Sequence, residues 1–118
     1  MRMTPLHKAI YLLFITNRKR GIVLQQLEEL HGELVKLYCK TLHKEQLNPK
    51  ELMRINNLES SYKDEDSTIH YNISKINRYF RDLMDEHLAY HYYITGIPGE
   101  PYNINLNDDL IIWEDTYE

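Results

Sequence analysis

The amino-acid sequence predicts a mostly α-helical domain that ends in a β-hairpin. Apolar residues recur at helical spacing as far as about residue 87, and apolar and polar residues then alternate with a period of two around a turn. The length of 118 residues, with 42% hydrophobic and 27% charged residues, is typical of one soluble globular domain. We therefore expect residues 1–118 to form a single domain.

The first helix is expected at residues 5–17. Thr4 is a suitable N-cap, and Pro5 stands at the first helical position, where its missing N–H is not needed. The apolar residues that follow at helical spacing are Leu6, Ile10, Leu13 and Phe14. Gly21 stops the helix, and the apolar residues 21–24 predict a short strand.

Two further helices are expected at residues 25–46 and 49–60. The apolar stripe of the longer one consists of Leu27, Leu30, Leu34, Leu37, Tyr38 and Thr41. Gly32 marks a candidate kink in it, since glycine is a poor helix former. The shorter helix has a strong start signal, with Asn48 as cap, Pro49 at the first position and Glu51 placed to reach back to the cap. Its stripe is Leu52, Ile55 and Leu58.

A fourth helix, at residues 68–87, is predicted to have one apolar and one polar face. The apolar stripe consists of Ile69, Ile73, Ile76, Phe80 and Leu83. The opposite face carries Tyr71, Ser74, Lys75, Arg78 and Arg81. This helix therefore combines a core contact with a cationic surface.

The β-hairpin is expected over about residues 90–106. Tyr92 and Ile94 share one face of its first strand, and Tyr102, Ile104 and Leu106 share one face of its second. The loop between them, residues 96–101, contains two glycines and two prolines. A last apolar segment is expected at residues 110–113.

The order of these elements is helix, short strand, three helices and hairpin. A helical trio whose last helix leads directly into a β-hairpin is the winged-helix arrangement, a variant of the helix-turn-helix. In helix-turn-helix proteins the recognition helix lies in the major groove of DNA. The sequence therefore predicts a winged helix with its fourth helix in the recognition position.

Two family resemblances follow from local motifs. The stretches 74–80, 93–96 and 99–104 resemble the end of a response-regulator C-terminal effector domain, in which the recognition helix carries a serine followed by basic residues and the wing contains a threonine, glycines and a tyrosine. This chain lacks the arginine that the family usually places in the wing, and it lacks the leading sheet. Segments 4–6, 11–14 and 92–101 also resemble small uncharacterised bacterial proteins, a resemblance that implies no function.

The charge distribution is strongly polarised along the chain. Residues 1–81 hold 14 basic and 9 acidic side chains, a net charge of +5, whereas residues 82–118 hold 9 acidic and no basic ones. The overall charge of −4 therefore conceals a basic part that is able to attract nucleic acid and an acidic part that repels it.

The sequence contains no motif for several classes of function. No apolar run is long enough to span a membrane and no signal peptide is recognisable, so we expect a cytoplasmic location. Cys39 is the only cysteine, which excludes an intramolecular disulfide and an all-cysteine metal site. No phosphate-binding loop or nucleophile motif occurs either. We expect no enzymatic activity, no cofactor, no metal and no small-molecule substrate.

The leading functional prediction is binding of double-stranded DNA by a transcriptional regulator. The candidate DNA-binding residues on the fourth helix are Asn72, Ser74, Lys75, Arg78 and Arg81, which would contact base edges or phosphates. The basic triplet Arg18, Lys19 and Arg20 would add contacts to the DNA backbone. Because so few cations are available, we expect tight binding to require a dimer.

The alternative prediction is a protein–protein interaction module. Ten of the 13 aromatic residues are tyrosines, and Tyr90, Tyr93 and Tyr102 lie in or beside a wing that has no cation. Tyrosine combines a large apolar contact area with a polar end, which protein interfaces favour. The partner would be another protein or a second copy of this chain.

Overall fold

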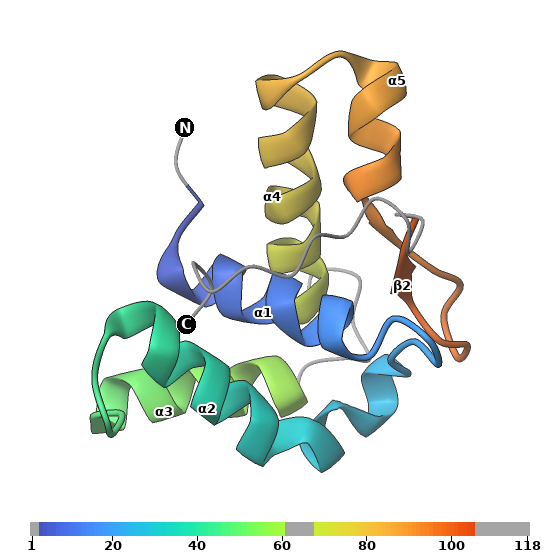
Figure 1. Cartoon of the computed structure of the whole chain (residues 1–118). Helices are drawn as coiled ribbons and strands as arrows, with labels where there is room; N and C mark the ends of the chain where they lie inside the picture. Colours follow the sequence, from blue (N-terminus) through green and yellow to red (C-terminus); the bar gives the residue numbers. More distant parts are fainter. Residues whose placement is uncertain (1–2, 61–67, 106–118) are drawn as a thin grey trace.

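The computed structural model describes residues 3–60 and 68–105 of the chain. Within these residues five α-helices account for most of the regular structure, and a small two-stranded antiparallel sheet lies near the C-terminal end. Helices α2 (His31–Leu42) and α3 (Pro49–Ser60) lie on one side of α1 (Pro5–Thr16), and α4 (Thr68–Leu83) crosses α1 and extends beyond it, with α5 (Glu86–Ala89) at its side (Figure 1). The mostly helical fold class with a terminal hairpin is confirmed.

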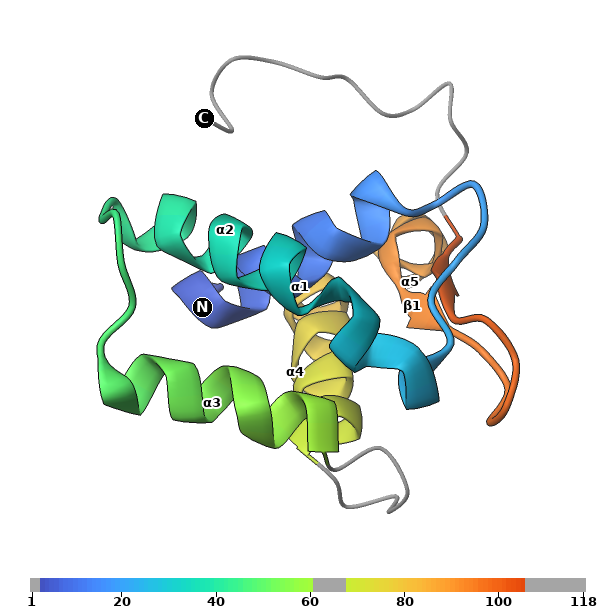
Figure 2. The ribbon, with the colours of Figure 1, turned by 90° about the horizontal axis from the view of Figure 1, so that it is seen from below.

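Helix α1 begins as its sequence predicts and forms the centre of the core. The Thr4 hydroxyl accepts a hydrogen bond from the His7 backbone N–H at 3.2 Å, and Pro5 occupies the first turn. Its fully buried residues are Ala9, Ile10, Leu13 and Phe14, and α2 packs along it (Figure 2). The apolar stripe therefore places α1 between the other helices.

The prediction of one long helix at residues 25–46 is wrong. The chain instead forms a 3-10 helix, η1 (Leu24–Leu30), followed by α2, and Gln26 inside η1 has non-helical angles of φ −110° and ψ 16°. Leu24, Leu27 and Leu30 recur every three residues, which matches the three residues per turn of a 3-10 helix. The break therefore lies before Gly32, at Leu30, and α2 ends at Leu42.

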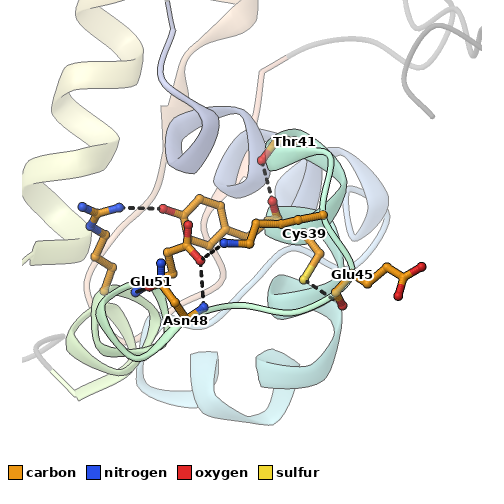
Figure 3. Close-up of polar contacts among 8 residues, drawn as sticks. Cys39, Thr41, Glu45, Asn48 and Glu51 are labelled. Carbon is orange, nitrogen blue, oxygen red and sulfur yellow. Dashed lines mark hydrogen bonds and ion pairs between the residues drawn. The ribbon is translucent and has the colours of Figure 1, made fainter.

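Helix α3 matches its predicted bounds, and its N-terminal capping box is present. The Asn48 side chain accepts from the Glu51 backbone N–H at 2.9 Å, and the Glu51 carboxylate accepts from the Asn48 N–H at 2.8 Å (Figure 3). Lys44 donates to the same carboxylate oxygen at 2.7 Å. Ile55 and Leu58 are buried, whereas Leu52 is exposed at the edge of the predicted stripe.

The fourth helix ends earlier than the predicted residue 87. Helix α4 stops at Leu83, and the Asp85 side chain accepts from the His87 N–H at 3.2 Å to start α5. A capping aspartate offers the backbone a new helix start, and this competes with continuing the old helix. Ile69, Ile73, Ile76 and Phe80 are buried as predicted, but Leu83 is 59% exposed because the helix ends there.

The hairpin is much shorter than the predicted residues 90–106. Its strands are β1 (Ile94–Thr95) and β2 (Asn103–Ile104), with Ile94 opposite Ile104. Residues Tyr90–Tyr92 form a 3-10 helix, η2, that continues α5, so the predicted strand position of Tyr92 is wrong. The backbone N–H groups of Tyr90 and Tyr93 form hydrogen bonds within the α5–η2 segment, so they are not available to a longer strand. Leu106 and the predicted apolar segment 110–113 lie outside the described residues.

The short strand predicted at residues 21–24 is reduced to an isolated bridge at Ile22, because η1 already begins at Leu24. Ile22 and Tyr102 exchange backbone hydrogen bonds of 2.8 and 2.7 Å in an antiparallel bridge. Gly96 allows the hairpin to close here, because a Cβ at this position would overlap the Tyr102 ring. The chain after α1 is thereby tied to the hairpin. Among the described residues, none of the helices has the length and apolar character needed to cross a membrane.

Candidate nucleic-acid interface

The exposed side of α4 forms an open depression of about 540 Å³ beside the hairpin. Its lining residues are Tyr71, Ser74, Lys75, Asn77, Arg78, Arg81 and Tyr93. Six of these seven come from α4, spaced so that they lie along one side of the helix, and Tyr93 comes from the segment before β1. The structure therefore brings together Ser74, Lys75, Arg78 and Arg81, four of the predicted DNA-binding residues.

Among the described residues, the three cations of this depression have only weak partners. The Lys75 ammonium lies 5.3 Å from the centre of the Tyr71 ring. The Arg78 Nε is 3.9 Å from an Asp82 carboxylate oxygen, and both side chains are at least half exposed, so the pair is weak and screened. Arg81 is exposed and has no ion pair within residues 3–60 and 68–105. The cations are therefore available to an anionic ligand.

Asn77 holds α4 against the hairpin. Its side-chain amide donates to the Ile94 carbonyl at 2.9 Å and accepts from the Ile94 N–H at 2.8 Å. The amide thus satisfies both backbone groups of a buried strand residue, as a neighbouring strand would. No local sequence pattern points to Asn77, because the strand residue that its amide binds lies 17 positions away.

Asn72 lies in the interior of the protein, whereas the sequence predicted that it would contact a base edge. It is only 6% exposed, and its amide donates to the Thr68 carbonyl at 2.6 Å. Its carbonyl oxygen lies 2.7 Å from His7 Nε2, which must therefore carry the proton. Burial lowers the pKa of His7, against the opposing effect of the Asn72 hydrogen bond, so the imidazole is neutral at pH 7. Asn72 and His7 therefore join α4 to α1.

The basic triplet after α1 does not line the depression. Arg18 donates to the Ile15 carbonyl at 3.0 Å, and Arg20 donates to the Asn17 side chain at 3.2 Å. Lys19 is exposed, and Arg20 borders a separate depression next to Gly21. Any contact from the triplet to the same ligand must therefore extend beyond the α4 depression.

The three tyrosines of the alternative prediction lie in different environments. Tyr90 is 57% exposed, and its ring makes an edge contact with that of Tyr93, 6.4 Å between centres. Tyr93 is half-buried and lines the α4 depression. Tyr102 is only 8% exposed and packs edge-on to His70, so it belongs to the core and is not a surface contact. Of these three tyrosines, Tyr90 and Tyr93 are therefore the two that are accessible to a protein partner.

The described residues contain no group of three or more potential metal ligands. Cys39 is half-buried, and its thiol lies 3.7 Å from the Glu45 carbonyl oxygen (Figure 3). The α4 depression, in contrast, combines three cations with two tyrosine rings.

Comparison with known proteins finds no match to a protein-family model, a curated protein or a solved structure.

Proposed function

We propose that this chain is a winged-helix protein of the cytoplasm that binds double-stranded DNA through α4 and regulates transcription. The order of elements supports the fold: α4 leads through α5 and η2 into the hairpin, and Ile22 adds a third segment next to Tyr102. In this arrangement α4 is the helix that enters the major groove. The hairpin loop, residues 96–101, is the wing.

The observation that carries the proposal is the set of weakly partnered cations on α4. Lys75, Arg78 and Arg81 lie on the exposed side of one helix together with the hydroxyl of Ser74. A helix fits the width of the major groove, where arginine recognises guanine and serine contacts several bases. Lysine and arginine side chains also neutralise phosphates, which supplies most of the affinity for DNA.

The wing contributes little to this binding. Residues 96–101 contain Glu100 and no cation, so the loop adds no phosphate contact through a charged side chain. Three cations on α4 provide weak binding to a single site, and the basic triplet adds to it only if DNA extends past the hairpin. Two copies on adjacent half-sites would double the number of contacts, and we therefore propose that the DNA-bound form is a dimer.

The decisive experiment measures duplex binding by fluorescence anisotropy at several salt concentrations. Changing Lys75, Arg78 and Arg81 together to alanine should abolish most binding and flatten the log–log salt dependence by about 2.7, at about 0.9 per lost phosphate contact. A matched control changes Lys36, Lys40 and Lys50, which are equally basic and exposed on α2 and α3. The control should bind nearly as the unaltered protein does, and equal losses in both variants would reject the site.

A protein partner is the second candidate function, and a specific observation favours it. Three large apolar side chains near the α4–α5 junction are strongly exposed: Leu83 at 59%, Leu88 at 50% and Tyr90 at 57%. Such residues are typical of protein contacts. If the unaltered protein binds no duplex at low salt, Leu88→Ala and Tyr90→Ala should instead weaken its self-association or its capture of a protein partner.

A further inference from the structure

Two tyrosine rings border the cations of the α4 depression, and contacts to phosphates and base edges make no use of them. Tyr71 lies on α4 one turn before Lys75, and Tyr93 lies in the segment before β1. An aromatic ring offers a flat apolar face on which another ring stacks. The depression therefore has a second chemical character beside its positive charge.

The two rings differ in how far they are accessible to a ligand. Tyr71 is 58% exposed, with the Lys75 ammonium over its ring, 5.3 Å from the centre. Tyr93 is half-buried, and its ring makes an edge contact with that of Tyr90. The Tyr93 backbone is held as well, because its N–H donates to the Tyr90 carbonyl at 3.3 Å. Tyr71 is therefore the ring that presents more of its surface to a ligand.

A nucleobase presents its flat face to such a ring only when it is unpaired. Within a duplex the faces of each base are covered by the neighbouring base pairs, and a helix in the major groove reaches base edges. In a single strand the bases separate from one another and stack on aromatic side chains. Sites for single strands combine such rings with a row of cations that follows the phosphate backbone.

The cations of the depression are placed for one phosphate backbone. Lys75, Arg78 and Arg81 recur every three residues, so they extend over about 9 Å of the α4 axis at 1.5 Å per residue. The hairpin loop, residues 96–101, contains Glu100 and no cation. A duplex has two backbones, whereas a single strand has one, which the row on α4 is able to neutralise without the hairpin.

We propose that the α4 depression binds single-stranded DNA, with an unpaired base stacked on Tyr71 and the phosphates beside Lys75, Arg78 and Arg81. The use of these cations for DNA phosphates rests on the proposed function, whereas the stacked base goes beyond it. A single strand makes both kinds of contact and a fully paired duplex makes only the contacts to cations and base edges. The protein therefore binds the single strand more tightly than the duplex.

Fluorescence anisotropy with two labelled probes tests this preference. The probes are an oligothymidylate, which has little structure of its own, and a fully paired duplex of the same length. Tyr71→Ala should weaken binding of the oligothymidylate by about 5- to 150-fold, which is the effect of losing one stacked base. Tyr71→Phe keeps the ring and should bind it nearly as the unaltered protein does.

Tyr90→Ala is the matched control. Tyr90 is 57% exposed, almost the same as Tyr71, but it does not line the depression. The control should therefore bind the oligothymidylate nearly as the unaltered protein does. Circular dichroism verifies the folding of each variant.

The salt dependence separates stacking from charge. Tyr71→Ala should weaken binding by the same factor at every salt concentration and leave the log–log slope unchanged. Changing Lys75, Arg78 and Arg81 together to alanine should flatten that slope by about 2.1, at about 0.7 per phosphate contact of a single strand.

Three results would overturn the single-strand site. They are equal affinities of Tyr71→Ala and the unaltered protein for the oligothymidylate, equal losses in Tyr71→Phe and Tyr71→Ala, and tighter binding of the duplex than of the oligothymidylate. Duplex binding in the last case would still support the proposed function. If the oligothymidylate is bound and the duplex is not, the proposed function fails and the single-strand site stands, whereas binding of neither probe rejects both.

Discussion

Single polar side chains decide how the basic surface is positioned. Asn77 binds both backbone groups of Ile94, and Asn72 joins α4 to His7 of α1. Neither amide is free to contact DNA in this arrangement. Their side chains keep the orientation of α4, while Lys75, Arg78 and Arg81 carry its charge.

A pH-dependent contribution to stability is expected at Glu51. The hydrogen bond from Lys44, and next the backbone N–H of Asn48, hold the pKa of this carboxyl below its ordinary value of 4.5. Because the pKa is lowered in the folded state, the stabilisation is complete above pH 4.5 and is lost as the pH falls through the lowered value. Urea unfolding should therefore show Glu51→Gln to be less stable at pH 7, with the difference shrinking in acid.

Glu45 provides the control for this prediction. It lies near Asn48 and is exposed, and Glu45→Gln should leave both the stability and its dependence on pH nearly unchanged. A constant difference between Glu51→Gln and the unaltered protein from pH 7 to strongly acidic solution would contradict the assignment.

At the scale of the elements, contacts between α4 and the hairpin hold the proposed recognition helix and the wing together. Strands of two residues are too short to be stable alone, so the hairpin depends on its neighbours. Those neighbours are Ile22, which pairs with Tyr102, and Asn77, which pairs with Ile94.

Replacing Asn77 by alanine should therefore weaken the α4–β1 contact. The substitution leaves the N–H and C=O of Ile94 without these partners, and we expect a loss of about 1–3 kcal/mol in the free energy of unfolding. Ser74 is exposed on the same helix, and Ser74→Ala should alter the free energy of unfolding by less than about 0.5 kcal/mol. Chemical denaturation measures both, and similar values for the two variants would mean that the Asn77 contacts contribute nothing.

At the scale of the whole molecule, one aromatic cluster joins the N-terminal and C-terminal halves. The Phe80 ring lies 5.0 Å from that of Tyr11 and 5.2 Å from that of Tyr92, so it connects α1, α4 and η2. The same chain places its excess positive charge before residue 82 and its negative charge after it. The core thus holds together two parts of opposite charge.

Truncation of Phe80 should destabilise the entire fold. Phe80→Ala removes a buried ring and leaves a cavity between three elements, which typically lowers the free energy of unfolding by about 3–5 kcal/mol. Leu83 lies one turn later on α4 but is exposed, so Leu83→Ala should lower the free energy of unfolding by less than about 0.5 kcal/mol. Thermal melts compare the two, and a loss at Phe80 below about 1 kcal/mol would show that the ring is not part of the core.

The sequence alone determined the features that depend on neighbouring residues. The start of α1 at Thr4 and the capping box of α3 involve groups three residues apart, so local pattern is sufficient to predict them. The cationic face of α4 follows in the same way from helical periodicity. Tertiary structure alone decided the pairing of Ile22 with Tyr102, the burial of Asn72 and the clamp of Asn77 on Ile94. These contacts join residues between 17 and 80 positions apart, and their energies depend on packing that no local pattern contains.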